Sequence, residues 1–304
     1  MNDQAQNLRN LIKNKGLLSK FNIQNQQENI EEGTINLPKQ KAKVISVTSG
    51  KGGVGKSNIS VNLALALIEL NKKVLIIDAD LGLSNIEVLI GNSPKWNLRE
   101  VIYGEKDISE IIEEGPNGLK FISGGSGLID LAQIDQEKIQ ELIKCFEMID
   151  NSFDFIIIDT GAGISNNVLS FVLAADQVIV VTLPEPTAIT DGYAIIKAII
   201  NKMPEKEISL IINRVQNQQE AIEVHQRLNN VIKRFLQKDV EYLGYIEHND
   251  IVSKAVLYQT PVILYNPKCD VSRQVRNIAS KISGNINNEE VGGIKRLLNI
   301  LLKK

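Results

Sequence analysis

Residues 50–57 constrain this chain more than any other feature of its sequence. They read GKGGVGKS, which fits the pattern G-x-x-x-x-G-K-[S/T] of loops that bind nucleotide phosphates. The β-rich run Lys43–Thr48 precedes the loop, and the helical run Ser57–Leu70 follows it. A strand, a glycine loop and a helix N-terminus in this order direct backbone N–H groups to one point, where a polyphosphate is favoured. The alternative is that Lys56 is an ordinary surface lysine and Ser57 only a helix cap.

Within this loop each polar residue has an expected role. We expect the Lys56 amine to lie on the β- and γ-phosphates and the Ser57 hydroxyl to bind Mg²⁺. Lys51 comes directly after the first glycine, and this additional lysine is free to reach a nucleotide that faces the loop. The predicted phosphate-binding residues are Gly50, Lys51, Gly52, Gly53, Val54, Gly55, Lys56, Ser57 and Asn58.

The rest of the chain predicts an α/β fold around this loop. At 304 residues, of which 43% are apolar and 23% charged, it can bury a full core. Its strands are nearly continuous apolar runs, typical of a doubly wound, mostly parallel sheet with helices on both faces. We expect a flexible extension at 1–40, a nucleotide-binding domain at 41–284 and a hinge with an amphipathic helix at 285–304. The predicted strands are Val44–Thr48, Val74–Asp78, Phe153–Asp159, Val178–Leu183, Ile208–Asn213 and Glu241–Ile246, with helices at 136–150, 187–202 and 217–237.

Carboxylates follow two of these strands, at the sheet edge where ligands of such folds bind. Asp159 closes a run of three isoleucines opposite the loop, an arrangement that holds Mg²⁺ through water. Asp78 and Asp80 end the second strand, where one carboxylate can support the loop and the magnesium shell while the other faces the γ-phosphate. The alternatives are that Asp80 and Asp159 cap the helices that follow them.

Together, the loop with its additional lysine and these strand-end carboxylates resemble the MinD/ParA class of deviant Walker-A ATPases, over about residues 43–284. The resemblance implies ATP and Mg²⁺ as cofactors, slow ATP hydrolysis and a face-to-face dimer in which Lys51 reaches the partner's phosphates. Lys51, Lys56 and Asp80 would then be catalytic, Asp80 by positioning water. It also implies that Asn213, followed by Arg214, reads the adenine, although this pair fits a turn equally well. The turn with Pro184 and Glu185 would border the nucleotide.

The N-terminus indicates which family within this class the chain resembles. Ala5, Leu8, Leu11 and Ile12 fall on one face of a short helix over Asp3–Lys13. The same stretch resembles the D-Q-A-x-x-L-R element of the FlhG family, whose members are MinD-like regulators of flagellar number and placement. The alternative interpretation is a polar helix that frays at a terminus. Residues 159–163 also look more like FlhG than MinD, which usually has a proline there. The resemblance implies an SRP-type GTPase (FlhF) and flagellar basal-body or C-ring components as partners, and the expected partner-binding residues are Asp3, Gln4, Ala5, Leu8 and Arg9.

A short basic amphipathic segment closes the sequence. Its apolar residues, which include Val291 and Leu302, fall on one side of a helix over about 290–304, and lysine and arginine flank them. Such a helix can lie in a membrane interface but is too short to cross it. It also fits a helix docked on the domain or a dimer contact. The predicted membrane-binding residues are Ile294, Lys295, Arg296, Leu297, Leu298 and Leu301.

Composition and charge argue against several other classes of protein. The formal charge is 34 − 36 = −2, so a ParA-type DNA-partitioning role would need a local basic patch, and no sequence-specific nucleic-acid binding is expected. Cys145 and Cys269 form no C-x-x-C pair, which argues against an iron–sulfur carrier, and His225 and His248 are poor metal candidates. A metabolic P-loop enzyme would need a pocket for a second substrate, and the sequence shows no motif for one. With no signal peptide and no 18-residue apolar run, we expect a cytoplasmic protein that binds reversibly to the inner face of the cell membrane. A MinD-type regulator of cell division remains the nearest alternative.

Overall fold

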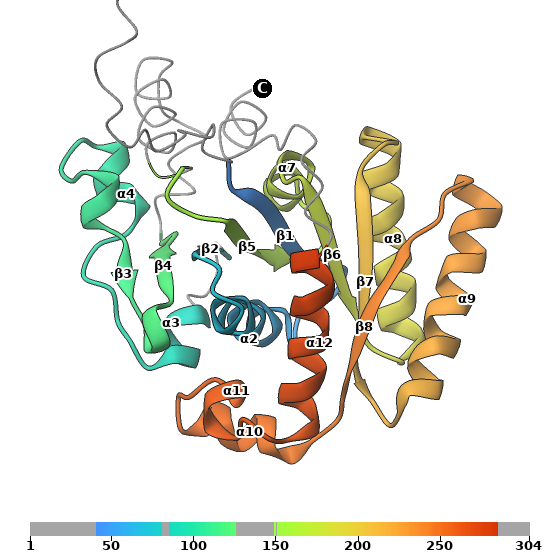
Figure 1. Cartoon of the computed structure of the whole chain (residues 1–304). Coiled ribbons are helices and arrows are strands. Elements are labelled where there is room, and N and C mark those ends of the chain that lie inside the picture. Colours follow the sequence, from blue (N-terminus) through green and yellow to red (C-terminus); the bar gives the residue numbers. More distant parts are fainter. Residues whose placement is uncertain (1–40, 81–84, 126–148, 150, 285–304) are drawn as a thin grey trace, which may run out of the picture. The chain divides into compact units, whose positions relative to one another are not determined.

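An eight-stranded sheet organises the chain in the computed structural model, which describes residues 41–80, 85–125, 149 and 151–284 (Figure 1). The strand order is β3-β4-β2-β5-β1-β6-β7-β8, and every neighbouring pair is parallel except β3 and β4. The predicted doubly wound, mostly parallel sheet is confirmed. The strands are β1 (Lys43–Ser49), β2 (Val74–Ala79), β3 (Glu113–Glu114), β4 (Lys120–Ser123), β5 (Phe155–Ala162), β6 (Gln177–Thr182), β7 (Glu207–Val215) and β8 (Glu241–Glu247).

Helices cover both faces of this sheet. One face carries α2 (Lys56–Glu69), α3 (Asn85–Ile90), α10 (Asp250–Leu257), α11 (Val262–Tyr265) and α12 (Asp270–Gly284). The other carries α4 (Leu98–Ile102), α7 (Asn166–Ala174), α8 (Pro186–Lys202) and α9 (Gln218–Leu236). Two 3-10 turns, Ile108–Glu110 and Pro116–Gly118, flank β3. None of the helices in these described ranges is long and apolar enough to cross a membrane.

The central strands are apolar along their whole length because both of their faces are covered. Ile157 of β5 packs into the core beneath α2, whereas its neighbours Ile156 and Ile158 pack into the core beneath α4 and α7. All three are fully buried. Strand alternation therefore sends consecutive isoleucines into two different cores, which explains the unbroken apolar runs in the sequence.

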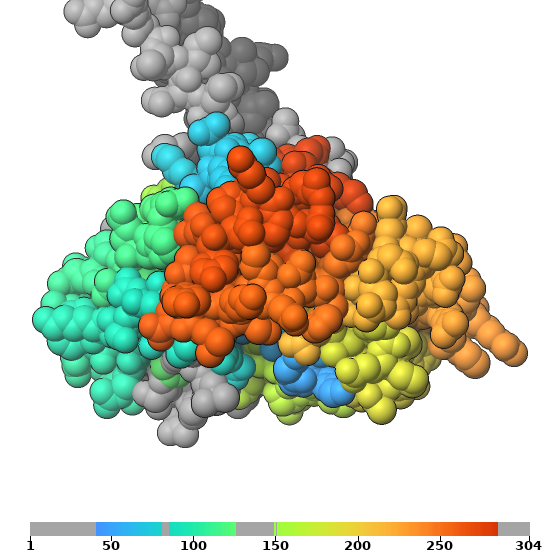
Figure 2. All heavy atoms as spheres, turned by 90° about the horizontal axis from the view of Figure 1, so that it is seen from below, coloured from blue at the N-terminus to red at the C-terminus, as the bar shows by residue number. Residues whose placement is uncertain are grey.

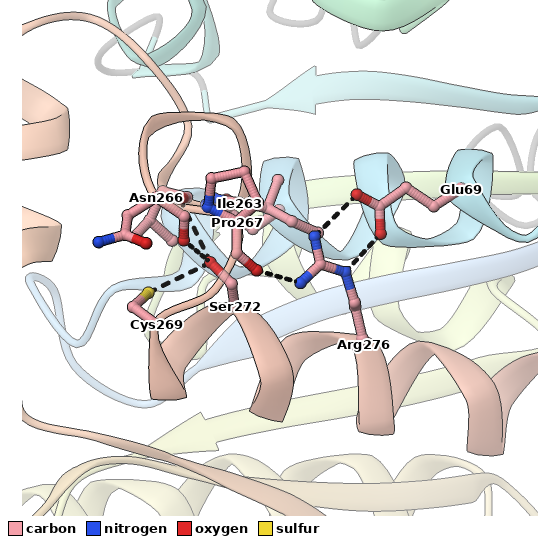
Figure 3. A network of polar contacts seen from close by, with 9 residues as sticks. Glu69, Ile263, Asn266, Pro267, Cys269, Ser272 and Arg276 are labelled. Atoms are coloured by element: carbon pink, nitrogen blue, oxygen red, sulfur yellow. Dashed lines mark hydrogen bonds and ion pairs between the residues drawn. The ribbon is translucent and has the colours of Figure 1, made fainter.

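A polar network fixes α12, the last helix in the described part of the chain, to α2, the helix that follows the glycine loop (Figure 3). The Arg276 guanidinium donates to both carboxylate oxygens of Glu69, with Nε to Oε2 at 2.6 Å and Nη2 to Oε1 at 2.9 Å. The Ser272 hydroxyl donates to the Asn266 carbonyl at 2.8 Å. From α2, the Asn62 side-chain oxygen accepts the backbone N–H of Ile263 at 3.0 Å. The helix that opens at the loop is thus held by polar contacts with both α11 and α12.

The structure adds elements that the sequence did not predict and leaves others outside its described part. The strands β3 and β4 were missed because runs of two and four residues give too little period to recognise. The predicted helices at 187–202 and 217–237 are confirmed as α8 and α9. The predicted helix at 136–150, apart from residue 149, and both terminal segments lie outside the described residues.

Candidate functional site

The glycine loop leaves the carboxyl end of β1, the strand that lies between β5 and β6. Gly53 and Gly55 have positive φ values of 75° and 94°, which residues other than glycine rarely adopt. Gly55 is the N-cap of α2, and no acidic residue occupies the first turn of that helix. The unpaired N–H groups of this turn therefore favour an anion at the loop.

Two later segments of the chain pack so closely against this loop that Gly50 and Gly55 have no room for a side chain. A Cβ atom on Gly50 would lie 2.1 Å from the backbone oxygen of Asp191 in α8. A Cβ atom on Gly55 would lie 2.5 Å from the side-chain nitrogen of Asn213 at the end of β7. Seen from below, blue atoms from the region of β1 and the loop adjoin yellow-green atoms from later in the chain, and the orange atoms of the α10 and α11 region lie on the same face (Figure 2). The loop is shaped by contacts with distant parts of the chain.

Lys56 and Asp159 of β5 are both buried at the base of the loop. Lys56 is 7% exposed and Asp159 is not exposed at all. The Ser60 hydroxyl donates to Asp159 Oδ1 at 2.9 Å, whereas Asp159 Oδ2 has no hydrogen-bond partner among the described residues. Burial raises the pKa of Asp159, and the Lys56 charge and the Ser57 and Ser60 hydroxyls oppose that rise. A buried carboxylate oxygen without a partner fits a hydrated Mg²⁺ held beside the Ser57 hydroxyl.

Asp78 lies beside Asp159 in the register of β2 and β5. Its Oδ1 accepts the N–H of Asp80 at 3.1 Å and its Oδ2 accepts the N–H of Ile86, in the first turn of α3, at 3.3 Å. Burial and then the negative charge of Asp159 raise the pKa of Asp78 to about 7, against those backbone hydrogen bonds. Both oxygens of Asp78 thus bind backbone, so this carboxylate holds the end of β2 and the start of α3.

The Asp80 carboxylate faces the segment that follows Asp159. A Cβ atom on Gly161 would lie 3.6 Å from Asp80 Oδ1, and the Asn85 side-chain amide donates to Asp80 Oδ2 at 3.4 Å. The segment that it faces is tied to the loop, because the N–H of Gly163 donates to the Ser49 carbonyl at 2.8 Å. The helix after Asp159 is capped by Ser165, whose hydroxyl accepts the N–H of Val168 at 3.3 Å. Asp159 is therefore not that helix cap.

Asn213 connects the end of β7 to the loop. Its amide donates to the Val54 carbonyl at 2.7 Å, and its oxygen accepts the N–H of Arg214, which has a positive φ of 56°. Beside it, a cavity of about 260 Å³ opens between α2, the end of β8 and helices α10 to α12. Most of its lining surface is apolar, and several polar side chains also line it, which fits a planar heterocycle. The lining residues that the sequence interpretation missed include Glu247, His248 and Asn249, although their position after a predicted strand was a usable signal.

The predicted loop lysine and turn glutamate meet in the structure. Lys51 Nζ lies 2.9 Å from Glu185 Oε2, and Glu185 is the N-cap of α8. Pro184, directly before it, is partly buried. The structure thus brings together the loop, Asp78, Asp80, Asp159, Asn213 and Glu185, whereas the predicted partner-binding and membrane-binding residues lie outside the described ranges.

The chain is similar to known proteins. Residues 42–213 match the family model described as an AAA domain. The chain is 38% identical to the antiactivator FleN of Pseudomonas aeruginosa over 240 residues, which are 79% of this chain and 86% of FleN. It is also 38% identical to the flagellum site-determining protein YlxH of Helicobacter pylori over 257 residues, covering 84% of this chain and 82% of YlxH. Among solved structures, the MinC:MinD cell division protein complex of Aquifex aeolicus matches with a TM-score of 0.65 and 27% identity, covering 81% of this chain and 98% of that one.

Two glycines of the loop test the crowding directly. Gly55→Ala should lower the free energy of unfolding by about 2 kcal/mol or more, because the new methyl group meets Asn213 and the backbone has a positive φ. Gly52→Ala is the matched control, since nothing lies within 4 Å of the place that its Cβ atom would take. Urea unfolding of both variants measures the difference. Equal stabilities would show that the contact with Asn213 does not constrain the loop.

Proposed function

Because the chain belongs to the MinD/ParA family of P-loop ATPases, as its matches to FleN, YlxH and MinD show, we propose that it is a switch that dimerises face to face on ATP and separates after hydrolysis. One observation carries the proposal: the two lysines of a single loop differ in exposure. Lys56 is 7% exposed, whereas the Lys51 side chain is 39% exposed. A buried lysine serves the nucleotide of its own chain, and an exposed one is placed to serve a nucleotide on a facing copy.

The site residues divide the chemistry of hydrolysis among them. The loop N–H groups and Lys56 bind and neutralise the phosphates of ATP. Ser57 and Asp159 would hold Mg²⁺, which supplies further positive charge at the phosphates. Asp80 positions the attacking water, since this residue is partly exposed and its carboxylate faces Gly161 near the end of β5. Asn213 and the apolar cavity beside it would accept the adenine, with Arg214 and the turn at Pro184 and Glu185 bordering the nucleotide.

Lys51→Ala tests the dimer. We expect this variant to bind ATP as a monomer almost as well as the wild type, because Lys56 and the loop N–H groups remain, and to lose ATP-dependent dimerisation. Light scattering with ATP and Mg²⁺ gives the molecular mass. Asp80→Ala, which should stall hydrolysis and trap the dimer, is the comparison. A Lys51→Ala protein that still dimerises on ATP contradicts the role of Lys51 on the facing copy.

For the output of the switch we propose control of flagellar number and placement at the membrane. The names of FleN, an antiactivator, and of YlxH, a flagellum site-determining protein, support it. The partners would be an SRP-type GTPase like FlhF, bound through the N-terminal motif, and components of the flagellar basal body or C-ring. The C-terminal segment with Leu297 and Leu301 would anchor the dimer reversibly at the bilayer, since two copies raise the effective concentration of a weak anchor. A MinD-type role in cell division is the competing assignment, supported by the match to the MinC:MinD complex.

A peptide of residues 1–20 separates these two outputs. We expect it to accelerate GTP hydrolysis by the cognate SRP-type GTPase, because its apolar face offers a binding surface and Gln4 and Arg9 lie off that face. Gln4→Ala or Leu8→Asp should abolish the acceleration. Gln6→Ala, at a variable position of the motif, is the matched control and should stay active. If GTP turnover is unchanged by the wild-type peptide, the flagellar assignment fails and the MinD-type role replaces it.

A further inference from the structure

The exposed loop lysine already has an anionic partner within its own chain. Lys51 Nζ donates to Glu185 Oε2 at 2.9 Å, although the two residues are 134 positions apart in sequence. Both side chains are substantially exposed, at 39% for Lys51 and 54% for Glu185. The lysine that the proposed dimer needs for a facing nucleotide is therefore bound to a carboxylate in the single chain.

The position of Glu185 is set by the fold. It is the N-cap of α8, yet its side chain makes no capping hydrogen bond to that helix, and Pro186 follows as the first helical residue. The carboxylate is thereby left to reach the loop. The loop and α8 also pack too closely for any side chain at Gly50, where a Cβ atom would lie 2.1 Å from the Asp191 carbonyl oxygen. Because both backbones are fixed, the ammonium and the carboxylate meet without a rearrangement.

The negative charge of Glu185 competes for Lys51 with any phosphate on a facing copy. An ammonium that crosses to a partner must leave its carboxylate, and the two symmetric copies must each break one such pair. An exposed ion pair of this kind corresponds to a factor of about 1.5 to 5 in an equilibrium constant. This factor is small enough for the highly charged phosphates of ATP to displace Glu185 from Lys51. Because the dimer breaks two such pairs, the factor enters the dimerisation constant twice.

We infer that Glu185 is an intramolecular catch for Lys51: it holds the ammonium in the monomer, gives it up to the partner's nucleotide on dimerisation and recaptures it after hydrolysis. This inference rests on the proposed ATP-dependent dimer. The catch sets the protein concentration at which the dimer forms. It also favours separation once hydrolysis and phosphate release remove charge from the nucleotide, because Glu185 then competes against a weaker anion.

Glu185→Gln tests the catch, since it removes the charge and keeps the shape of the side chain. With Mg²⁺ and a non-hydrolysable ATP analogue, the dimer of this variant should form at about 2- to 25-fold lower protein concentration than that of the wild type, the square of the single-pair factor. Glu205→Gln is the matched control: Glu205 is also an exposed carboxylate in an ion pair, with Lys238, so the variant has the same net charge without touching Lys51. Sedimentation velocity measures the dissociation constants.

Two further readouts separate the catch from a merely structural role and from the dimer itself. Dimers of Glu185→Gln assembled with ATP should dissociate more slowly after hydrolysis than those of Glu205→Gln. In the nucleotide-free protein, Lys51 should be acylated faster by an amine reagent in Glu185→Gln than in Glu205→Gln, as mass spectrometry of the Lys51 peptide measures. Wild-type protein that stays monomeric with the analogue would overturn the proposed dimer. A wild type that dimerises, together with a Glu185→Gln dimer no tighter than that of Glu205→Gln, would overturn the catch alone.

Discussion

The buried pair of charges at the base of the glycine loop is the constraint on which the rest of the site depends. Lys56 and Asp159 lie almost wholly out of water, and removing ionised groups from water is costly unless they are paired and hydrogen-bonded. Their meeting requires β5 to lie directly beside β1, which the strand order provides. It also requires Ser60, one turn into α2, to donate to the carboxylate. Asp159 Oδ2 has no hydrogen-bond partner among the described residues. A hydrated Mg²⁺ bound beside it would complete the arrangement.

In the proposed dimer, the two lysines of the loop would divide their roles between the single chain and a second copy. Lys56 is buried and its charge interacts with Asp159 of β5, whereas Lys51 forms an exposed ion pair with Glu185 at the N-cap of α8. Both carboxylates come from segments more than 100 residues away along the chain, so the fold, rather than the loop alone, decides which lysine faces which nucleotide. If the proposed dimer forms, this separation would make the loop both a nucleotide site and part of the interface.

Much of this arrangement could be predicted from the sequence, because the signals are local. The glycine pattern, the apolar runs of the six long strands and the strand-end aspartates each depend on neighbouring residues. The predicted strand bounds lie within three residues of the observed ones, with the largest difference at the end of β5. The contacts of Asn213 with Val54 and of Glu185 with Lys51 could not be predicted, since each joins residues more than 130 positions apart. The cavity beside Asn213 was missed for the same reason, because helices α10 to α12 return to the loop only in the folded chain.

The most direct test of the account is the dependence of ATP turnover on protein concentration. If the active species is a face-to-face dimer, the hydrolysis rate per protein molecule, measured with saturating ATP and Mg²⁺, should rise with protein concentration and level off once all molecules are paired. Its midpoint should coincide with the midpoint of dimer formation. A rate per molecule that stays constant from concentrations well below that midpoint to well above it would contradict the account, because each chain would then hydrolyse ATP alone.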